Sequence, residues 1–433
     1  MNDKTLLKNA TLVGLEPIKL EQKDLLIVDG RVAQKDDRIQ PPRDARLVDC
    51  RGRFVLPGFV NAQSRLYASQ SLLLPRDDAA ETTVESLRYE EHDRIARVLT
   101  QETIVTSVFA GALEAVRYGT TTVIDRHSSP NCISGSLDLV RDTVLTVGPR
   151  AILSYEISGR GEEAEQLQAI AENRRFAREN RTDRVAGYFS VDSAGRLSDS
   201  TLAEMMRESR GSMVASTLGE ETEIEGRLLD RLEAAGLLGE RPVFSAAGRI
   251  EAADRQKLKD MGIWTLTCPN ANARLGLPPL PFETMGEMVA LGTGAVPGDL
   301  FSESRSAWLA ARARGAAIRP EDVVKLIVGG HQLASEILGL ELGSTRRDAG
   351  ADFIVLDYHP RTRVVPDNLA AHLLFGMRVA DISMVMTDGE FVYRNGAFPE
   401  IDIQRLAPLV RRGADELWNA IRGETATAGV AEG

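Results

Sequence analysis

The middle of the chain alternates short apolar runs with longer stretches that carry apolar residues at helical spacing. Residues 103–119 and 321–338 show this helical spacing, and a further helix is expected from Thr201, which stands at capping-box spacing from Glu204. Eight apolar runs of strand length begin at Val55, Thr120, Ala151, Val185, Met213, Pro242, Trp264 and Met288. Eight strand–helix units predict an α/β fold with a closed (β/α)8 TIM barrel, and a doubly wound open sheet is the alternative.

Both ends of the chain have a different pattern. The first 56 residues hold short β-like runs separated by Gly, Asp and Pro, and residues 351–358 and 382–396 also read as strands, with a hairpin turn at Asp388 and Gly389. We therefore expect a small β-sandwich domain built from both termini. The predicted division is 1–56 for its first part, 57–342 for the barrel, and 343–433 for its second part and a frayed tail from Gly423.

Composition and charge limit the possible partners. The chain has 433 residues, and its net charge of −11 argues against nucleic acid and anionic membranes as partners. Its three cysteines are widely separated, and no run reaches the roughly 18 apolar residues of a membrane span. The N-terminal residues lack the apolar core of a signal peptide. These features favour a cytoplasmic protein.

Polar side chains gather where the predicted strands end, which is the end of a (β/α)8 barrel that carries the active site. These strand ends are Asn61 to Arg65, Asp125 to His127, Glu156, Asp192, Thr217 to Glu220, Ala247 to Arg249, Cys268 to Asn272, and Thr293 to Asp299. We expect Asp125, Arg249 and Asp299 to line a pocket there. Asp299 has a second interpretation, as the N-cap of the following helix.

Four segments resemble the amidohydrolase superfamily, in its deaminase and chlorohydrolase-like branch. They read VLPGFVNAQSRL, YGTTTVIDRHSSP, LGTGAVPGDLF and ADFIVLDYHP. Within that branch the chain resembles aminohydrolases associated with selenium metabolism. The resemblance implies a TIM barrel with a β-sandwich flank, a dimer, and a zinc or iron ion whose hydroxide attacks a C–N or C–Cl carbon. The family holds this ion with His-x-His after strand one, a His after strand five, another after strand six, and an Asp after strand eight.

Carried onto this chain, the resemblance places none of these ligands. The His-x-His positions hold Gln63 and Arg65, and the three later positions hold Thr217, Ala247 and Gly294. Ser216 and Ser245, the nearby alternatives if the alignment slips, are no better ligands. Gln is a weak neutral ligand, Ala and Gly have no donor atom, and Arg is a permanent cation. We therefore expect neither zinc nor iron, and no other metal, at this site.

Arg65 is expected to point into the barrel mouth and to need a carboxylate partner, because an unpaired buried charge costs several kcal/mol. Glu220 is the first candidate, with Asp125 and Asp299 as alternatives. An arginine there can clamp an anion through two hydrogen bonds, so the small-molecule ligand is expected to be anionic.

Glu220 also matches the family's proton-shuttling Glu, and His127 is a second candidate catalytic residue, although a hydrogen-bonded loop histidine is an equal interpretation. The other candidates have simpler interpretations. We expect His331 to pack inside a helical stretch and His92 to be solvated on a charged helix face. Structural roles are expected for His359, His372 and Cys268. The charged insertion at residues 72–94 either covers the pocket, forms a dimer contact, or is a solvated helix.

Three functions remain open at this point. The first, which the loss of every ligand favours, is a non-hydrolytic pseudoenzyme that keeps the fold and binds a small molecule. The second is a C–N hydrolase that works without the usual metal site, supported by Glu220, His127 and the acidic strand ends. The third is a structural subunit, in a homodimer or paired with a catalytic homologue.

Overall fold

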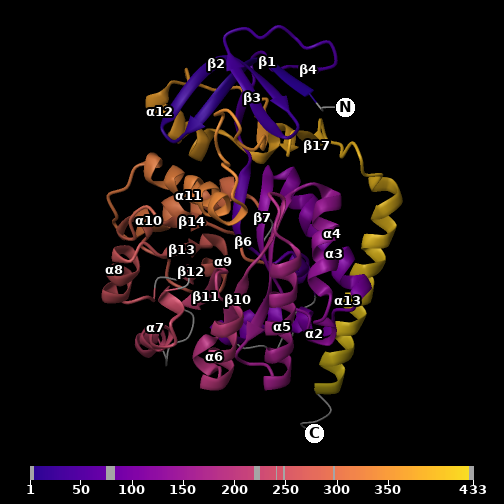
Figure 1. The fold of residues 1–433 in the computed structure, drawn as a ribbon, viewed down its shortest axis with the longest axis vertical. Coiled ribbons are helices and arrows are strands. Elements are labelled where there is room, and N and C mark those ends of the chain that lie inside the picture. The colour runs from indigo at the N-terminus through magenta and orange to yellow at the C-terminus, as the bar shows by residue number, and fades with distance from the viewer. Residues whose placement is uncertain are drawn as a thin grey trace.

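A computed structural model describes residues 4–74, 83–218, 225–239, 241–246, 249–295 and 298–428. Two sheets organise the chain, and Figure 1 shows the sheet of the termini above a barrel surrounded by helices. The predicted barrel with a small β domain built from both termini is therefore confirmed. Among the described residues, no helix is long and apolar enough to cross a membrane.

The barrel sheet runs in the order β14-β13-β12-β11-β10-β8-β7-β6, with β9 beside β8, and its pairings are parallel. Its strands are β6 (Phe59–Ser64), β7 (Thr120–His127), β8 (Arg150–Ser158), β9 (Val185–Gly187), β10 (Phe189–Asp192), β11 (Val214–Leu218), β12 (Pro242–Ala246), β13 (Trp264–Thr267) and β14 (Val289–Leu291). The circle closes through a parallel bridge between Ser64 and Gly294. The eight predicted runs thus supply the barrel, and the open doubly wound sheet is excluded.

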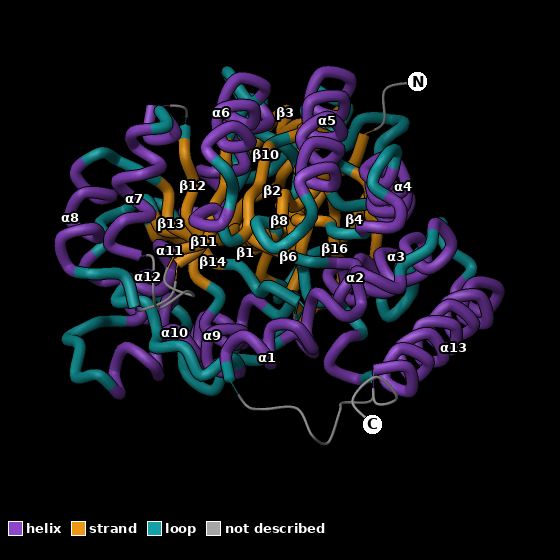
Figure 2. Tube along the Cα trace, turned by 90° about the horizontal axis from the view of Figure 1, so that it is seen from below, coloured by secondary structure: helices purple, strands orange, loops and turns teal. Residues whose placement is uncertain are grey.

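Helices surround the barrel (Figure 2). They are α3 (Gln101–Arg117), α4 (Ser136–Val147), α5 (Glu163–Glu179), α6 (Asp199–Glu208), α7 (Glu225–Ala234), α8 (Ala252–Asp260), α9 (Pro269–Arg274), α10 (Leu300–Ala313) and α11 (Pro320–Leu338). The start predicted for α6 is wrong, because Ser198, not Thr201, is its N-cap and accepts from the Thr201 amide.

Alternation along the strands separates two apolar cores. Ile124 of β7 belongs to a cluster that also holds Val60, Ile152 and Leu266, one from each of three other barrel strands, and this cluster fills the barrel. Its neighbour Val123 belongs to the cluster formed with the surrounding helices. Even-numbered residues of β7 and β8 therefore face inward. The even-numbered polar residues toward the ends of these strands face inward as well.

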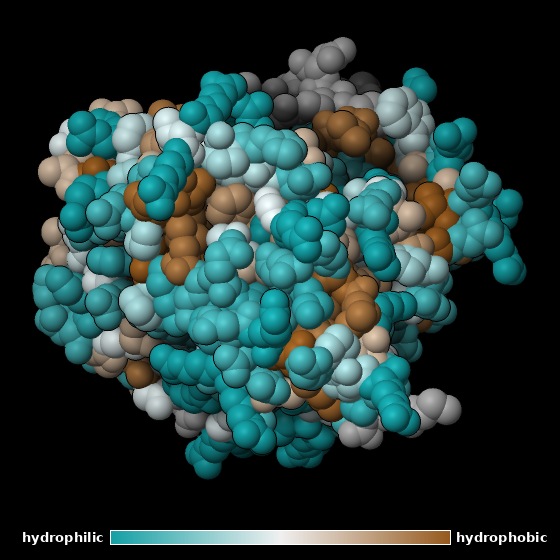
Figure 3. All heavy atoms as spheres, turned by 90° about the horizontal axis from the view of Figure 1, so that it is seen from above, coloured by the Kyte–Doolittle hydropathy of each residue, from teal (hydrophilic) through white to brown (hydrophobic). Residues whose placement is uncertain are grey.

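The termini form one eight-stranded sheet in the order β17-β16-β15-β5-β1-β2-β3, with β4 beside β1. Its strands are β1 (Lys4–Leu15), β2 (Ile18–Val28), β3 (Arg31–Asp36), β4 (Arg46–Asp49), β5 (Phe54–Pro57), β15 (Phe353–Leu356), β16 (Ile382–Thr387) and β17 (Glu390–Arg394). The predicted turn at Asp388 and Gly389 joins β16 to β17. On the face seen in Figure 3, apolar residues lie in small groups among hydrophilic ones, as expected for a solvated surface.

Gly58 divides the first predicted run between the two sheets. β5 before it belongs to the terminal sheet, and β6 after it opens the barrel. A Cβ at this position would lie 2.2 Å from Cγ2 of Thr121, so only glycine lets the chain pass. The Gly58 amide donates to the Asp352 carbonyl, and its carbonyl faces Nε2 of His331 at 2.8 Å.

The C-terminal α13 (Ile403–Ala428) was not predicted, and it packs along α3 at one side of the barrel (Figure 1). The helices approach closely where Gly413 meets Thr106, since a Cβ on Gly413 would lie 2.1 Å from the threonine hydroxyl. The backbone is helical to Ala428, so a frayed tail from Gly423 is wrong for that part. Residues 429–433 of the predicted tail lie outside the described residues.

A buried arginine joins the sheet to the barrel. Arg150, at the start of β8, is fully buried and binds Asp352 through Nε at 2.7 Å and Nη2 at 3.1 Å. The same Nη2 donates to Asp388 at 3.0 Å. Because both carboxylates belong to the terminal sheet segment, this contact ties the two sheets together.

We expect Arg150→Met to lower the free energy of unfolding by about 3–5 kcal/mol, because it leaves buried Asp352 without its cation. Urea unfolding followed by circular dichroism measures the loss. Arg178→Met removes an exposed arginine of α5 and should change stability by less than about 0.5 kcal/mol. Equal effects of the two substitutions would contradict a joint at Arg150.

Candidate functional site

Polar side chains from several strand ends meet in the barrel mouth, which is the end of the barrel away from the terminal sheet. Figure 2 views the molecule from that end. Arg65 directly follows β6, and its Nη2 donates to Oε2 of Glu156 on β8 at 2.7 Å. Their side chains are 7% and 8% exposed. The prediction that Arg65 enters the mouth and finds a carboxylate is met. The carboxylate is Glu156, and neither Asp125 nor Asp299 has an ion pair with Arg65 in the described structure.

A second buried ion pair lies beside the first. Arg88 of α1 (Val84–Arg88) binds Asp192 at the end of β10, and both side chains are almost completely buried. Arg160 approaches Asp192 and Asp93 to 3.9 Å. Cations from the barrel and from the segment above it thus converge on the same carboxylates.

The insertion after strand one covers this mouth. Its described part forms α1, η3 (Tyr89–Asp93) and α2 (Arg94–Val98), and residues 75–82 lie outside the described residues. Glu91 accepts from Arg274 at 3.1 and 2.8 Å, which fixes the segment to α9. The expectation of a solvated His92 is wrong, because His92 is 6% exposed, and burial lowers its pKa well below the usual value.

Burial and pairing set the charges of this cluster. Burial disfavours the charged Arg65 more than any other single effect, but Glu156, Tyr67 and Asp192 together outweigh it and raise the pKa of the guanidinium. Burial also opposes ionisation of Asp192, but Arg88, Arg160 and Arg65 together hold its pKa well below the usual range. For Asp125, burial outweighs the hydrogen bonds from Ser64 and the Leu66 amide, so its pKa is raised.

The side chains present do not fit the metal of the family. Arg65 places a guanidinium in the mouth, and Thr217 hydrogen-bonds the guanidinium of Arg126 at 3.2 Å. Gly294, whose carbonyl accepts from the Arg65 amide at 3.0 Å, lies beside Gln63 and has no donor side chain. In the described part of the chain, no three His, Cys, Asp or Glu residues are grouped so that they could hold a metal ion. Ala247 and Glu220 lie outside the described residues, and their assigned roles stay predictions.

His127 lies behind the mouth, on the outward face of β7. Its Nε2 is 2.9 Å from the Ser129 hydroxyl, and its ring packs edge-on against Tyr67 and Tyr155. Burial lowers its pKa to about 3, so the imidazole is neutral at physiological pH. These contacts favour the structural interpretation of His127 over the catalytic one.

Helix α10 brings two carboxyl groups to the edge of the mouth. Asp299 is its N-cap and accepts from the Ser302 amide at 3.0 Å, in agreement with its second interpretation. Glu303, which is 1% exposed, accepts from the Asn270 amide at 2.9 Å. Burial raises the pKa of Glu303 to about 8, so this side chain is largely protonated at pH 7.

The remaining candidates lie elsewhere. Cys268 is buried before α9, and Arg249 is half-buried just after β12. His331 is packed as predicted, and His372 is held between the hydroxyls of Tyr358 and Thr362. A structural role for His359 is wrong, because its side chain is 90% exposed.

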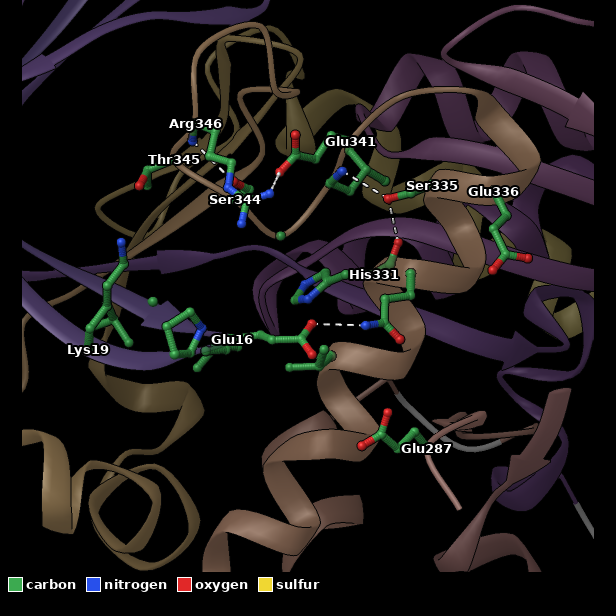
Figure 4. Close-up of a pocket in the computed structure, with 18 of the residues that line it drawn as sticks. Glu16, Lys19, Glu287, His331, Ser335, Glu336, Glu341, Ser344, Thr345 and Arg346 are labelled. Atoms are coloured by element: carbon green, nitrogen blue, oxygen red, sulfur yellow. Dashed lines mark hydrogen bonds and ion pairs between the residues drawn. The ribbon is translucent and has the colours of Figure 1, made fainter. Parts of the chain in front are cut away.

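A cavity of about 660 Å³ lies at the other end of the barrel, between β1, β2 and α11 (Figure 4). Several of its polar groups are paired within the protein. Gln332 donates to Glu16 at 2.9 Å, the Trp264 indole donates to Glu336 at 3.2 Å, and Arg346 lies 3.5 Å from Glu341. The Gln332–Glu16 pair links α11 of the barrel to the turn between β1 and β2 of the terminal sheet, so we regard this cavity as part of the joint.

Arg88 and Arg126 lie at the mouth but were not among the predicted site residues. Arg126 had a usable signal, because it stands two residues after inward-facing Ile124 on β7 and so shares its face. Arg88 had none, since its partner Asp192 is distant in the sequence and the fold alone brings them together.

The sequence model of the amidohydrolase family matches residues 54–392 of this chain. The 5-methylthioadenosine/S-adenosylhomocysteine deaminase of Bacillus cytotoxicus is 27% identical, over 94% of this chain and 98% of its own length. The enzyme of the same name from Thermococcus kodakarensis is 24% identical, over 89% and 93%.

Solved structures share the fold. A zinc-bound adenosine deaminase from Xanthomonas campestris superposes with a TM-score of 0.80 at 17% identity, covering 96% of this chain and 98% of its own. The zinc complex of atrazine chlorohydrolase from Arthrobacter aurescens gives 0.79 at 17%, covering 95% and 100%. At these identities the likeness establishes the architecture of barrel and terminal sheet.

We expect Arg65→Met to lower the free energy of unfolding by about 3–5 kcal/mol, because it leaves Glu156 charged and unpaired. The double variant Arg65→Met/Glu156→Leu removes both charges and should recover most of that loss. Urea unfolding of the wild type, both single variants and the double variant completes the cycle. Purely additive losses would show that the two side chains do not interact.

Glu303 should make stability depend on pH. Its pKa is raised from 4.5 to about 8, so between these values the folded state keeps a proton that the unfolded state releases. This proton's contribution to the free energy of unfolding is complete below pH 4.5 and is lost as the pH rises toward 8. The free energy of unfolding of Glu303→Gln, relative to that of the wild type, should therefore rise by a few kcal/mol from pH 5 to pH 8. Unfolding at several pH values tests this, with exposed Glu400→Gln as control, and a pH-independent difference would contradict it.

Proposed function

The chain belongs to the amidohydrolase family, and from this premise we propose that it is a non-hydrolytic member, a pseudoenzyme that binds a small molecule without a metal ion. The Arg65–Glu156 ion pair in the barrel mouth carries the proposal. A guanidinium supplies positive charge but cannot bind and ionise a water molecule, which is the role of the metal in hydrolysis. Without a metal, the pKa of water stays far above neutral pH, so hydroxide is scarce there.

The ligand is expected to be an anion, and Glu156 changes how it would be held. Nη2 of Arg65 already donates to that carboxylate, so an anion at this guanidinium competes with Glu156. A homodimer, or pairing with a catalytic homologue, and a cytoplasmic location are parts of the proposal that rest on the sequence.

The second candidate function is C–N hydrolysis of the deaminase type without the usual metal site. The relatives named as deaminases and the protonated carboxyl of Glu303 favour it, because a carboxylic acid with a pKa of about 8 can deliver a proton at neutral pH. One assay separates the two functions.

We expect protein purified without added metal to contain well under one equivalent of zinc, iron or manganese by mass spectrometry. We also expect no deamination of 5-methylthioadenosine, S-adenosylhomocysteine or adenosine after incubation with each metal, followed by the release of ammonia. The Bacillus cytotoxicus relative serves as the positive control.

Metal that survives dialysis at near one equivalent, with turnover that Glu220→Gln abolishes, would overturn the proposal. Turnover without any metal would establish the second candidate function instead.

A further inference from the structure

Arg126 is a buried cation on the inner wall of the barrel. It is 1% exposed and stands on β7 two residues after inward-facing Ile124. Its position therefore directs the side chain into the barrel. The hydrogen bond of 3.2 Å from its Nη1 to the hydroxyl of Thr217 agrees, since Thr217 continues the inward face of Ala215 on β11.

The surroundings of Arg126 differ from those of the other arginines at the mouth. Arg65 and Arg88 each have a carboxylate partner, Glu156 and Asp192. Across the described residues, Arg126 has no ion pair within 4 Å, and its Nη2 is buried without a hydrogen-bond partner.

Tyr188, a second polar neighbour of Arg126, is also neutral. Burial raises the pKa of Tyr188 to about 12, and the adjacent Arg126 guanidinium only partly opposes this shift, so the phenol keeps its proton at pH 7. The phenol and the Thr217 hydroxyl are uncharged, and neither balances the charge of the guanidinium.

A buried guanidinium without a counter-charge is costly, and an anion supplied by a ligand would remove that cost. We propose that Arg126 binds the carboxylate of a small monoanionic ligand. The proposal rests on the function proposed above and names the chemical class of its ligand.

A carboxylate suits this position for two reasons. Its two oxygens can accept hydrogen bonds from Nη1 and Nη2 at the same time. Nη2 has no hydrogen-bond partner, and Nη1 has a second N–H besides the one that it donates to Thr217. Its single charge would balance that of the Arg126 guanidinium, which has no ion pair across the described residues, whereas a dianion would carry a second charge that this guanidinium cannot balance. Arg65 and Arg88 can then stay paired while the ligand is bound.

The test compares carboxylates with their uncharged amides. Acetate and benzoate, titrated against the full-length protein at constant ionic strength, should raise the melting temperature with a saturable dependence on concentration. Acetamide and benzamide, of nearly equal shape, should have no effect. Arg126→Met should abolish the carboxylate shift, whereas Arg178→Met, which removes an exposed cation, should retain it.

A second variant guards against misfolding of Arg126→Met. Thr217→Val removes the hydroxyl that orients Arg126 but keeps the guanidinium, and it should weaken carboxylate binding at least several-fold by calorimetry. Equal shifts for acids and amides, no shift with either acid, or an unchanged shift in a folded Arg126→Met would each overturn the proposal and leave Arg126 as a structural residue.

These outcomes are distinct from a failure of the proposed function. Tightly bound metal with turnover would refute the pseudoenzyme even if carboxylates bind at Arg126. A protein without metal or turnover that ignores carboxylates would refute only the ligand class.

Discussion

The barrel mouth depends on the pairing of buried charge. Arg65 and Glu156 are both buried, and either one alone would be an uncompensated charge in an interior of low dielectric constant. Their pairing allows Arg88 and Asp192 to lie next to them and lets the segment above the mouth dock through charged side chains.

The architecture was readable from the sequence because it follows from periodicity. Neighbours such as Val123 and Ile124 go to opposite cores, and that alternation is written in each apolar run. Helix α13 also had a signal, with Leu406, Val410, Leu417 and Ile421 on one stripe, but Pro408 and a charged background obscured it. Local patterns therefore predicted the elements better than their ends.

The site was less predictable because its contacts are distant in sequence. The segment around His92 reads as a solvated helix, and only the partners of Glu91 and Arg88, on α9 and β10, explain its burial. Alternation alone also does not place Arg65, since the register of β6 against β7 shifts between Asn61 and Ser64. The residue types at the mouth were visible in the sequence, whereas the choice of Glu156 as partner required the fold.

The division at Gly58 also bears on how the chain folds as it is made. β5 pairs with β15, whose residues follow about 300 positions later, as in the match of Leu56 with Ile354. At roughly 5–20 residues per second, the ribosome delivers that partner tens of seconds after β5 emerges. One edge of β5 stays exposed during that interval, while the barrel strands between them are synthesised. During synthesis β5 is thus an unpaired strand edge, which is a site where another chain could pair wrongly.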